Sequence, residues 1–302
     1  MVYFISNTLS VSGRMRRAIR RAEAQFVGET VTCRKATDIK DYPAFFDGLA
    51  PEDSVVLLGG DGTLNYLINA IDPEQIKNPV YTCKAGTGND YMRDMLDNRV
   101  KDGTLYRIND TLVNLPVAEI DGKTYRFLNN CSFGIDGRVC SLMDDLKAKG
   151  HKRLNYTVLA AWLLFVYKPV SADVTVDGET RHFDNVWLAP TMNGRFFGGG
   201  MKMAPEQDRM SDKVTFGTFS CKNRLLTMLI FPQIFSGAHV RRTKYITMLE
   251  GNDIEVSYSE PRDAQMDGEV VRDVTSYRVH KEKDTEEVRQ KAEDEAFAAL
   301  FS

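Results

Sequence analysis

Residues 55–65 carry three glycines and one acid directly after a run of four apolar side chains, reading Val-Val-Leu-Leu-Gly-Gly-Asp-Gly-Thr-Leu-Asn. The apolar run predicts a short buried strand, and the amphipathic run 64–71 predicts a helix. Glycines at such a turn let the backbone approach a ligand, and a helix N-terminus presents free N–H groups to phosphate. Because an acid there would repel phosphate unless a cation lay between them, Asp61 predicts bound magnesium. The alternative is an ordinary Gly-Asp-Gly turn between a strand and a helix.

A second glycine-bearing turn follows the next predicted strand, residues 80–83. Residues 85–93 read Ala-Gly-Thr-Gly-Asn-Asp-Tyr-Met-Arg. Parallel strands end at the same edge of a sheet, so the two turns would place Asp61 and Asp90 around one pocket. Magnesium takes one or two carboxylates together with phosphate oxygens, and these aspartates supply that number. Asp90 would also suit the N-cap of a helix, and Arg93 would either neutralise phosphate or lie on an exposed helix face.

The first third of the chain alternates strands and helices. Strands are expected over 2–6, 30–33, 54–58 and 80–83, and helices over 14–26, 38–49 and 64–70. This βαβαβ order predicts an α/β domain with a doubly wound parallel sheet, which binds its ligand at the C-terminal ends of the strands.

The pattern changes after about residue 112, where short β-rich segments follow one another, separated by turns. We expect strands over 113–120, 123–131, 172–177, 181–190, 213–220, 245–249, 253–258, 264–267 and 269–279, and helices over 138–148 and 154–167. These segments predict an antiparallel sandwich or barrel. The last segment, 285–301, is predicted to be a helix that packs on the first domain. The expected domains are therefore residues 1–112 with 285–302, and residues 113–284.

Composition excludes several classes of protein. The chain has 302 residues, 43% apolar and 27% charged side chains and a net charge of −3, which are typical of a globular protein and not of a nucleic-acid binder. Its five scattered cysteines lack a metal-binding spacing and indicate reduced thiols in the cytoplasm. The N-terminus reads as a strand and not as a signal peptide. The most apolar run, 157–167, is about half the length needed to cross a bilayer, and its end at Lys168-Pro169 is typical of a buried helix.

Three further motifs follow in order: residues 131–137, Cys-Ser-Phe-Gly-Ile-Asp-Gly; residues 198–205, Gly-Gly-Gly-Met-Lys-Met-Ala-Pro; and residues 265–269, Gln-Met-Asp-Gly-Glu. Gly-Gly-Asp-Gly-Thr alone also occurs in sugar-phosphate and NAD kinases. Followed by Gly-Thr-Gly-Asn-Asp, Gly-Gly-Gly-Met and a late Asp-Gly-Glu, it is far more specific. Over nearly its whole length the sequence resembles the diacylglycerol kinase catalytic-domain family, in particular its soluble bacterial lipid kinases.

The resemblance implies a nucleotide-binding α/β domain, a β-sandwich domain that takes a lipid acceptor, and an active site in the cleft between them. It implies transfer of the γ-phosphoryl group of ATP to a lipid hydroxyl, with diacylglycerol the leading acceptor and phosphatidic acid the product. It also implies these residues: Asn7, Arg14, Gly59, Gly60, Gly62, Thr63, Gly86, Thr87, Asn89 and Arg93 at the nucleotide, Asp61 and Asp90 at magnesium, and Asp61 and Glu269 in catalysis, with Glu269 as the general base.

Some positions depart from the family's pattern. Residues 7–14 are longer than its N-terminal motif and lack the proline, and Asn114 stands where many members have an aspartate. Residues 211–213, Ser-Asp-Lys, replace an Asp-Asp-Gly that helps to hold a structural metal ion, so we do not expect a second metal. Asp267 is the nearest rival of Glu269 as the base.

Several interpretations stay open. The apolar segment 225–235, followed by Arg241, Arg242 and Lys244, is either a core helix or a surface that admits acyl chains and meets anionic headgroups. Asp136 either lines the acceptor site or satisfies backbone groups. The alternative enzyme is an NAD kinase, and the non-enzymatic alternative is a nucleotide- or lipid-binding protein without turnover. We expect a cytoplasmic protein, free or peripheral at the inner membrane face, with a lipid substrate, no nucleic-acid partner and no transmembrane segment; its oligomeric state, a homodimer included, is open.

Overall fold

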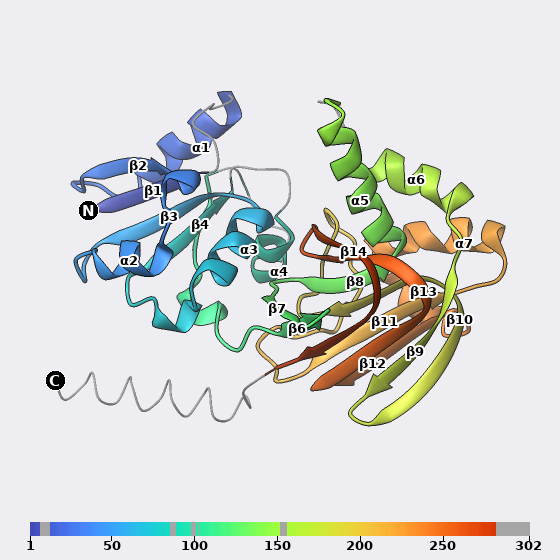
Figure 1. Cartoon of the computed structure of the whole chain (residues 1–302). Helices are drawn as coiled ribbons and strands as arrows, with labels where there is room; N and C mark the ends of the chain where they lie inside the picture. The colour runs from blue at the N-terminus through green and yellow to red at the C-terminus, as the bar shows by residue number, and fades with distance from the viewer. Residues whose placement is uncertain (7–12, 85–88, 98–100, 102, 152–155, 282–302) are drawn as a thin grey trace. The chain divides into compact units, whose positions relative to one another are not determined.

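The computed structural model describes residues 1–6, 13–84, 89–97, 101, 103–151 and 156–281 (Figure 1). The chain divides into two compact units, Met1–Val113 and one that begins at Asn114. Each unit has its own sheet and its own hydrophobic core. The helix predicted over 285–301 lies outside the described residues.

The first unit contains a five-stranded sheet with the order β2-β1-β3-β4-β5. Its strands are β1 Val2–Ser6, β2 Val31–Lys35, β3 Ser54–Gly59, β4 Val80–Lys84 and β5 Leu105–Arg107. The pairs among β1 to β4 are parallel, whereas β5 is antiparallel to β4. The predicted parallel sheet is therefore confirmed, with one antiparallel strand added at its edge.

Helices connect these strands. They are α1 Gly13–Glu23, α2 Tyr42–Asp47, α3 Asp61–Ala70 and α4 Asp90–Met95, with short 3-10 turns at Ala36–Asp38, Pro73–Gln75 and Asn109–Thr111. On one face of β3, Val56 and Leu58 pack in a core with Ala22 of α1, and the alternating Val55 and Leu57 are buried as well. Because both faces of the strand are covered, β3 reads as a continuous apolar run without alternation.

The second unit is an antiparallel β domain. Its strands are β6 Val117–Ile120, β7 Lys123–Arg126, β8 Asn130–Gly134, β9 Val170–Val176, β10 Glu179–Met192, β11 Val214–Ser220, β12 Ile246–Gly251, β13 Asp253–Met266 and β14 Glu269–His280. They follow the order β12-β11-β10-β8-β13-β14-β6-β7, and β9 pairs with both β10 and β13. Because β8 pairs with the same two strands, β8, β10, β9 and β13 close into a small barrel. The predicted antiparallel β-rich domain is confirmed in this closed form.

The predicted strand 123–131 is two strands in the structure, β7 and β8. Between them, the backbone amides of Leu128 and Asn129 donate to the carboxylate of Asp267 at 2.5 and 2.8 Å. An amide that donates to a side chain cannot also donate to a neighbouring strand, so the ladder is interrupted here.

Conversely, the predicted strands 253–258 and 264–267 belong to one strand, β13. Its pairing with β14 shifts between Ser257 and Ala264. Extra residues of this kind bend a strand without ending it, which makes the local turn signals misleading.

In its described residues the second unit has three helices: α5 Ile135–Ala148, α6 Tyr156–Val166 and α7 Arg224–Ile230, with 3-10 turns η4 Phe231–Phe235 and η5 Ala238–Arg241 after α7. The expectation that 157–167 is a buried helix is wrong for its outer face. Leu163 and Leu164 are buried, whereas Trp162 and Phe165 are exposed. A helix that is apolar all round carries no period from which its outer face can be read. No helix among the described residues is both long and apolar enough to cross a membrane.

Candidate active site

The glycine-rich turn links β3 to α3. β3 ends at Gly59, Gly60 is an extended N-cap residue, and α3 begins at Asp61, earlier than the expected start. A Cβ at Gly59 would lie 2.1 Å from the hydroxyl oxygen of Thr63, so packing requires glycine there. A Cβ at Gly62 would meet nothing within 4 Å. Packing therefore does not require glycine at this position, and the backbone on this side of α3 is open to a ligand.

The carboxylate of Asp61 accepts two backbone hydrogen bonds at the start of α4. Its Oδ2 accepts from the amide of Asp90 at 2.8 Å, and its Oδ1 accepts from the amide of Tyr91 at 3.1 Å. The first amides of a helix have no acceptor within the helix, so an acid placed there caps it. Asp61 therefore has a structural role as well as the predicted one: it fastens the turn after β3 to the start of α4.

Asp90 is brought next to Asp61 and is buried, with 3% of its surface exposed. Nη1 of Arg93 donates to Oδ1 of Asp90 at 2.7 Å. The negative charge of Asp90 is therefore paired with a positive charge on the same turn of α4. Asn89, also buried, is the N-cap residue of α4, and its side chain makes no capping bond. The capping role considered for Asp90 belongs instead to Asp61.

The predicted nucleotide contacts from the flanking segments are beyond what the structure describes. Asn7, Gly86 and Thr87 lie outside the described residues, and the side chain of Arg14, near the start of α1, is not described. Within the described ranges, no three His, Cys, Asp or Glu side chains form a metal cage. A cation at Asp61 and Asp90 would take its other oxygen ligands from phosphate and water, as is usual for magnesium.

The late Asp-Gly-Glu motif forms a tight hairpin between β13 and β14. Asp267 and Gly268 have positive φ angles of 48° and 97°, as a two-residue hairpin turn requires. The carboxylate of Asp267 accepts hydrogen bonds from three consecutive amides, residues 128–130, at 2.5 to 3.2 Å. Glu269 begins β14 with an exposed side chain. The two acids of the motif therefore differ in their surroundings. Asp267 anchors the turn through backbone hydrogen bonds, whereas the side chain of Glu269 is exposed just after the turn.

Gln265 connects this hairpin to the start of α5. Its Oε1 accepts from the amide of Gly268 at 2.8 Å, and its Nε2 donates to Oδ2 of Asp136 at 2.9 Å. Burial raises the pKa of the Asp136 carboxyl to about 6, and the hydrogen bond from Gln265 opposes this shift. A Cβ at Gly137 would lie 2.1 Å from the carbonyl oxygen of Asp263, so α5 starts directly against β13. We assigned no role to Gln265 from the sequence, because its partner lies 129 residues away.

A half-buried lysine holds the segment where the family resemblance placed a structural metal. Nζ of Lys281, just after β14, donates to the carbonyl oxygens of Arg209 at 3.1 Å and Ser211 at 2.5 Å. Burial lowers the pKa of Lys281 to about 8, and the charge of Arg209 acts in the same direction. Arg209 itself donates to the carbonyl oxygen of Leu128 at 2.9 Å. Residues 211–213 are therefore held by an ammonium group that belongs to the chain.

Two family models together match most of the chain. Residues 1–119 match the diacylglycerol kinase catalytic domain, and residues 129–280 match the YegS C-terminal NAD kinase beta sandwich-like domain. The boundary between the two matches falls close to the division between the two units of the structure.

Individual relatives are distant. A diacylglycerol kinase of Mycobacterium tuberculosis is 24% identical over 193 residues, and the match spans 62% of this chain and 62% of that protein's length. The putative lipid kinase YtlR of Bacillus subtilis is 25% identical over 236 residues, 72% of this chain and 74% of its own. A putative diacylglycerol kinase structure from Bacillus anthracis has a TM-score of 0.64 at 16% identity, covering 92% of this chain and 93% of that one. The last comparison establishes likeness of fold.

The buried carboxyl of Asp136 predicts a pH dependence of stability. A pKa raised from 3.8 to about 6 means that the folded state binds this proton more tightly than the unfolded state. The resulting stabilisation is complete below about pH 4 and is lost as the pH rises through about 6; its size is about 3 kcal/mol. Asp136→Asn keeps an acceptor for Gln265 and cannot ionise. Its free energy of urea unfolding should therefore rise by about 3 kcal/mol relative to the wild type between about pH 4 and pH 7.

Asp144→Asn, an exposed substitution on the same helix, is the matched control. Its difference from the wild type should stay constant over the same pH range. A constant difference for Asp136→Asn as well would contradict a titrating carboxyl at this buried position.

Lys281→Met should destabilise the second unit by about 1–3 kcal/mol, because it leaves the carbonyl oxygens of Arg209 and Ser211 without this donor. Thermal unfolding measures the loss. Lys213→Met, an exposed change in the neighbouring segment, should have little effect. Since the segment is held by an ammonium group, EDTA should leave the wild-type Tm unchanged. A wild-type Tm that falls in EDTA, or a Lys281→Met variant as stable as the wild type, would count against this role.

Proposed function

The chain belongs to the diacylglycerol kinase catalytic-domain family, and we propose that it transfers the γ-phosphoryl group of ATP to a lipid hydroxyl, with diacylglycerol as acceptor and phosphatidic acid as product. The observation that carries the proposal is the bond from the Asp90 amide to Asp61. It keeps two acids beside the open first turn of α3, at the C-terminal ends of β3 and β4. Ligands of parallel sheets bind at this edge.

The turn over residues 59–63 is the proposed phosphate site. The first turn of a helix offers backbone N–H groups to an anion, and the absence of a side chain at Gly62 leaves the backbone open there. Gly60 reaches the helix in an extended conformation, so the chain turns sharply into α3. The remaining nucleotide contacts are carried over from the family: Asn7, Arg14, Gly86, Thr87, Asn89 and Arg93.

The donor set beside this turn fits magnesium. Asp61 and Asp90 offer carboxylate oxygens, which magnesium prefers, and the amide bond from Asp90 to Asp61 keeps the two residues together. Magnesium held by these two acids would neutralise charge on the transferred phosphoryl group. Arg93, which already contacts Asp90, would add positive charge at the same place.

Glu269 is the proposed general base, which takes the proton of the attacking lipid hydroxyl. Its hairpin is held by two independent anchors, the bonds from the amides of 128–130 to Asp267 and the bond from Gln265 to Asp136. Asp267 is a poorer candidate, because its oxygens already accept three amide hydrogens. A base acts from about 2.6–3.2 Å, so the proposal requires the two units to bring Glu269 to the hydroxyl at the γ-phosphate.

Diacylglycerol is proposed as acceptor because relatives described above are named diacylglycerol kinase and putative lipid kinase. The direct test offers γ-labelled ATP with diacylglycerol, a total lipid extract and NAD side by side. We expect label in phosphatidic acid. Label in NADP would make the chain an NAD kinase, and nucleotide binding without any transfer would make it a binding protein.

Asp61→Asn should lower turnover at least about 100-fold, because the amide cannot supply a charge to magnesium; this corresponds to about 2.7 kcal/mol of transition-state stabilisation. It should also cost about 1 kcal/mol of stability, since one capping acceptor becomes a donor. The measurements are kcat with diacylglycerol in detergent micelles and the free energy of unfolding.

Asp41→Ala is the control for the loss of a cap. Asp41 caps α2 by accepting from the amide of Ala44 at 2.9 Å, so its removal should cost about 1 kcal/mol of stability and leave kcat unchanged. If Asp61→Asn keeps more than about a tenth of wild-type turnover, the magnesium role is refuted.

Glu269→Gln keeps the size of the side chain and cannot accept the proton, so kcat should fall by about 10²–10⁴-fold with little change in nucleotide affinity. Asp267→Asn should instead weaken the fold, because three amides lose a charged acceptor, while its folded fraction keeps turnover. The opposite pattern, an active Glu269→Gln beside a folded but inactive Asp267→Asn, would move the base to Asp267.

A further inference from the structure

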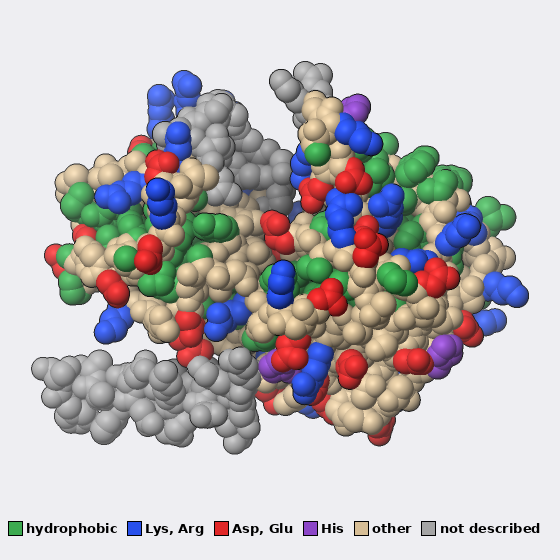
Figure 2. All heavy atoms as spheres, viewed as in Figure 1, with side chains coloured by type: hydrophobic (Ala, Val, Ile, Leu, Met, Phe, Trp, Pro, Cys, Tyr) green, Lys and Arg blue, Asp and Glu red, His purple; other side chains and the backbone are tan. Residues whose placement is uncertain are grey.

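Most of the exposed large hydrophobic side chains among the described residues lie on α6, α7 and η4. They include Trp162, Phe165 and Val166 of α6, Leu225 and Leu229 of α7, and Phe235 of η4, with between 49% and 73% of their surface exposed. Figure 2 shows hydrophobic side chains gathered over α6. Side chains of this size expose together on the order of 600 Å², at the upper end of what a monomer's largest apolar patch reaches. We call this surface the apolar face.

The apolar face is a fixed part of the fold. On the inner side, Leu163 of α6 and Ile230 of α7 pack in the same core. The side chains on the opposite side of each helix are therefore held toward solvent. Arg224 of α7 donates from Nη1 to the carbonyl oxygen of Leu164 and from Nη2 to that of Tyr167, both at 2.8 Å. Its guanidinium also lies 4.9 Å from the ring centre of buried Trp187. α6 and α7 are therefore tied together, and their outer side chains cannot turn inward without breaking the core.

The segments that build the apolar face carry only positive charge. Residues 146–172 and 213–249 together contain eleven Lys and Arg and no Asp or Glu, in a chain whose net charge is −3. Among the described residues, eight of these cations are exposed. Two are Lys147 and Lys213, and the other six are Lys149, Lys168, Lys222, Arg241, Arg242 and Lys244.

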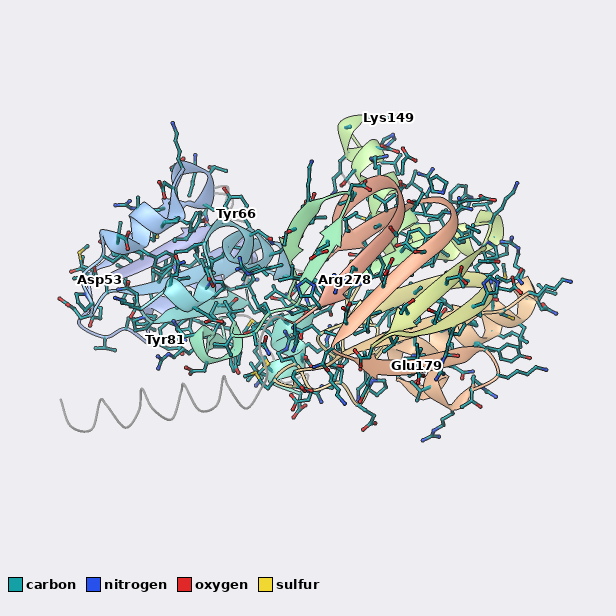
Figure 3. The ribbon with its side chains drawn as sticks, turned by 60° about the horizontal axis from the view of Figure 1, so that its bottom comes forward. Asp53, Tyr66, Tyr81, Lys149, Glu179 and Arg278 are labelled. Carbon is teal, nitrogen blue, oxygen red and sulfur yellow. The ribbon has the colours of Figure 1, made fainter. Side chains whose placement is uncertain are left out.

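These cations border the helices of the apolar face. Lys149 lies at the end of α5 (Figure 3). Lys168 follows α6, and Lys222 precedes α7. Arg242 donates from Nε to the side-chain oxygen of Gln233 in η4 at 3.2 Å, so it lies directly beside the apolar side chains. The acids of α5 nearest in sequence are paired: Asp144 with Lys147, and Asp145 with Arg272.

An apolar centre with a tryptophan and a border rich in lysine and arginine matches the chemistry of an anionic bilayer surface. The apolar side chains would enter the boundary between headgroups and acyl chains, and the cations would meet the phosphates. An ordinary protein partner would need a matching apolar patch that is also rimmed by acids, whereas anionic lipid supplies both parts at once.

We propose that the apolar face docks the chain on anionic membranes. The proposal rests on the lipid kinase function, which gives the chain a reason to contact a membrane. It adds the identity of the surface that makes this contact. The contact itself requires neither ATP nor turnover, so it is testable without an activity assay.

The test is co-sedimentation of the full chain with vesicles of phosphatidylcholine alone or with about one-third phosphatidylglycerol. The wild type should bind the anionic vesicles at least about tenfold more tightly than the neutral ones, and binding should weaken as salt rises from about 0.1 to about 0.5 M. Trp162→Ser with Phe165→Ser and Leu229→Ser should lower binding to anionic vesicles at least about tenfold. Arg241→Gln with Arg242→Gln and Lys244→Gln should remove the preference for anionic lipid.

Val27→Ser with Tyr66→Ser is the matched control. Both residues are exposed and apolar, and both belong to the first unit. This pair should bind vesicles like the wild type. If the triple serine variant, folded by circular dichroism, also binds like the wild type, the docking assignment is overturned. It is likewise overturned if the wild type ignores vesicles and the serine variant converts a wild-type dimer into a monomer, since the face would then be a contact between copies.

A paired activity measurement separates this proposal from the kinase function. With a short-chain diacylglycerol in solution, the triple serine variant should turn over like the wild type, and with diacylglycerol in anionic vesicles it should lose most activity. Vesicle binding by a wild type that phosphorylates neither substrate would refute the proposed reaction and leave the docking face standing. Equal losses on both substrates would contradict docking as the role of these side chains.

Discussion

The arrangement of the first unit's ligand edge depends on one carboxylate. Asp61 accepts hydrogen bonds from two amides at the start of α4. These bonds join the turn after β3 to the helix that follows the neighbouring parallel strand, β4. Without an acceptor, those amides would have to find water at a crowded helix terminus. The same bonds set the position of Asp90, and through Asp90 that of Arg93. One side chain thus sets where Asp90 and Arg93 lie relative to the first turn of α3.

The second unit uses aspartate in a similar way. Asp267 anchors the β13–β14 hairpin on residues 128–130, and Asp136 receives the side chain of Gln265 at the start of α5. In both units, an acid of a conspicuous motif holds backbone in place by accepting hydrogen bonds from consecutive amides. A Gly-Asp-Gly pattern therefore does not by itself identify a catalytic acid, because the glycines and the acid also stabilise the turn that they form.

The sequence predicted the architecture well, because strands buried on both faces and short alternating strands have distinct patterns. The four apolar residues of β3 and the glycines after them correctly predicted the turn from β3 to α3. The break after β7 could not be predicted, because it depends on Asp267, more than a hundred residues away. Gln265 and Lys281 were missed for the same reason: their roles come from partners that only the β-sheet register brings near. The exposure of one side of α6 was not predicted, because the sequence of an all-apolar helix does not distinguish its buried side from its exposed side.

Lys281 has a consequence for how the second unit responds to its surroundings. Its ammonium group is covalently part of the chain, so its local concentration at the carbonyl oxygens of Arg209 and Ser211 is fixed at all protein dilutions. A freely exchanging ion would leave such a site according to mass action as its supply fell. The lysine contact is therefore present whatever the supply of divalent ions. Burial lowers the pKa of Lys281 to about 8, so the unfolded chain binds this proton more tightly than the folded chain does. Deprotonation of Lys281 as the pH rises above about 8 therefore adds to the free energy of unfolding, and the neutral amine still has hydrogens to donate to the two carbonyl oxygens.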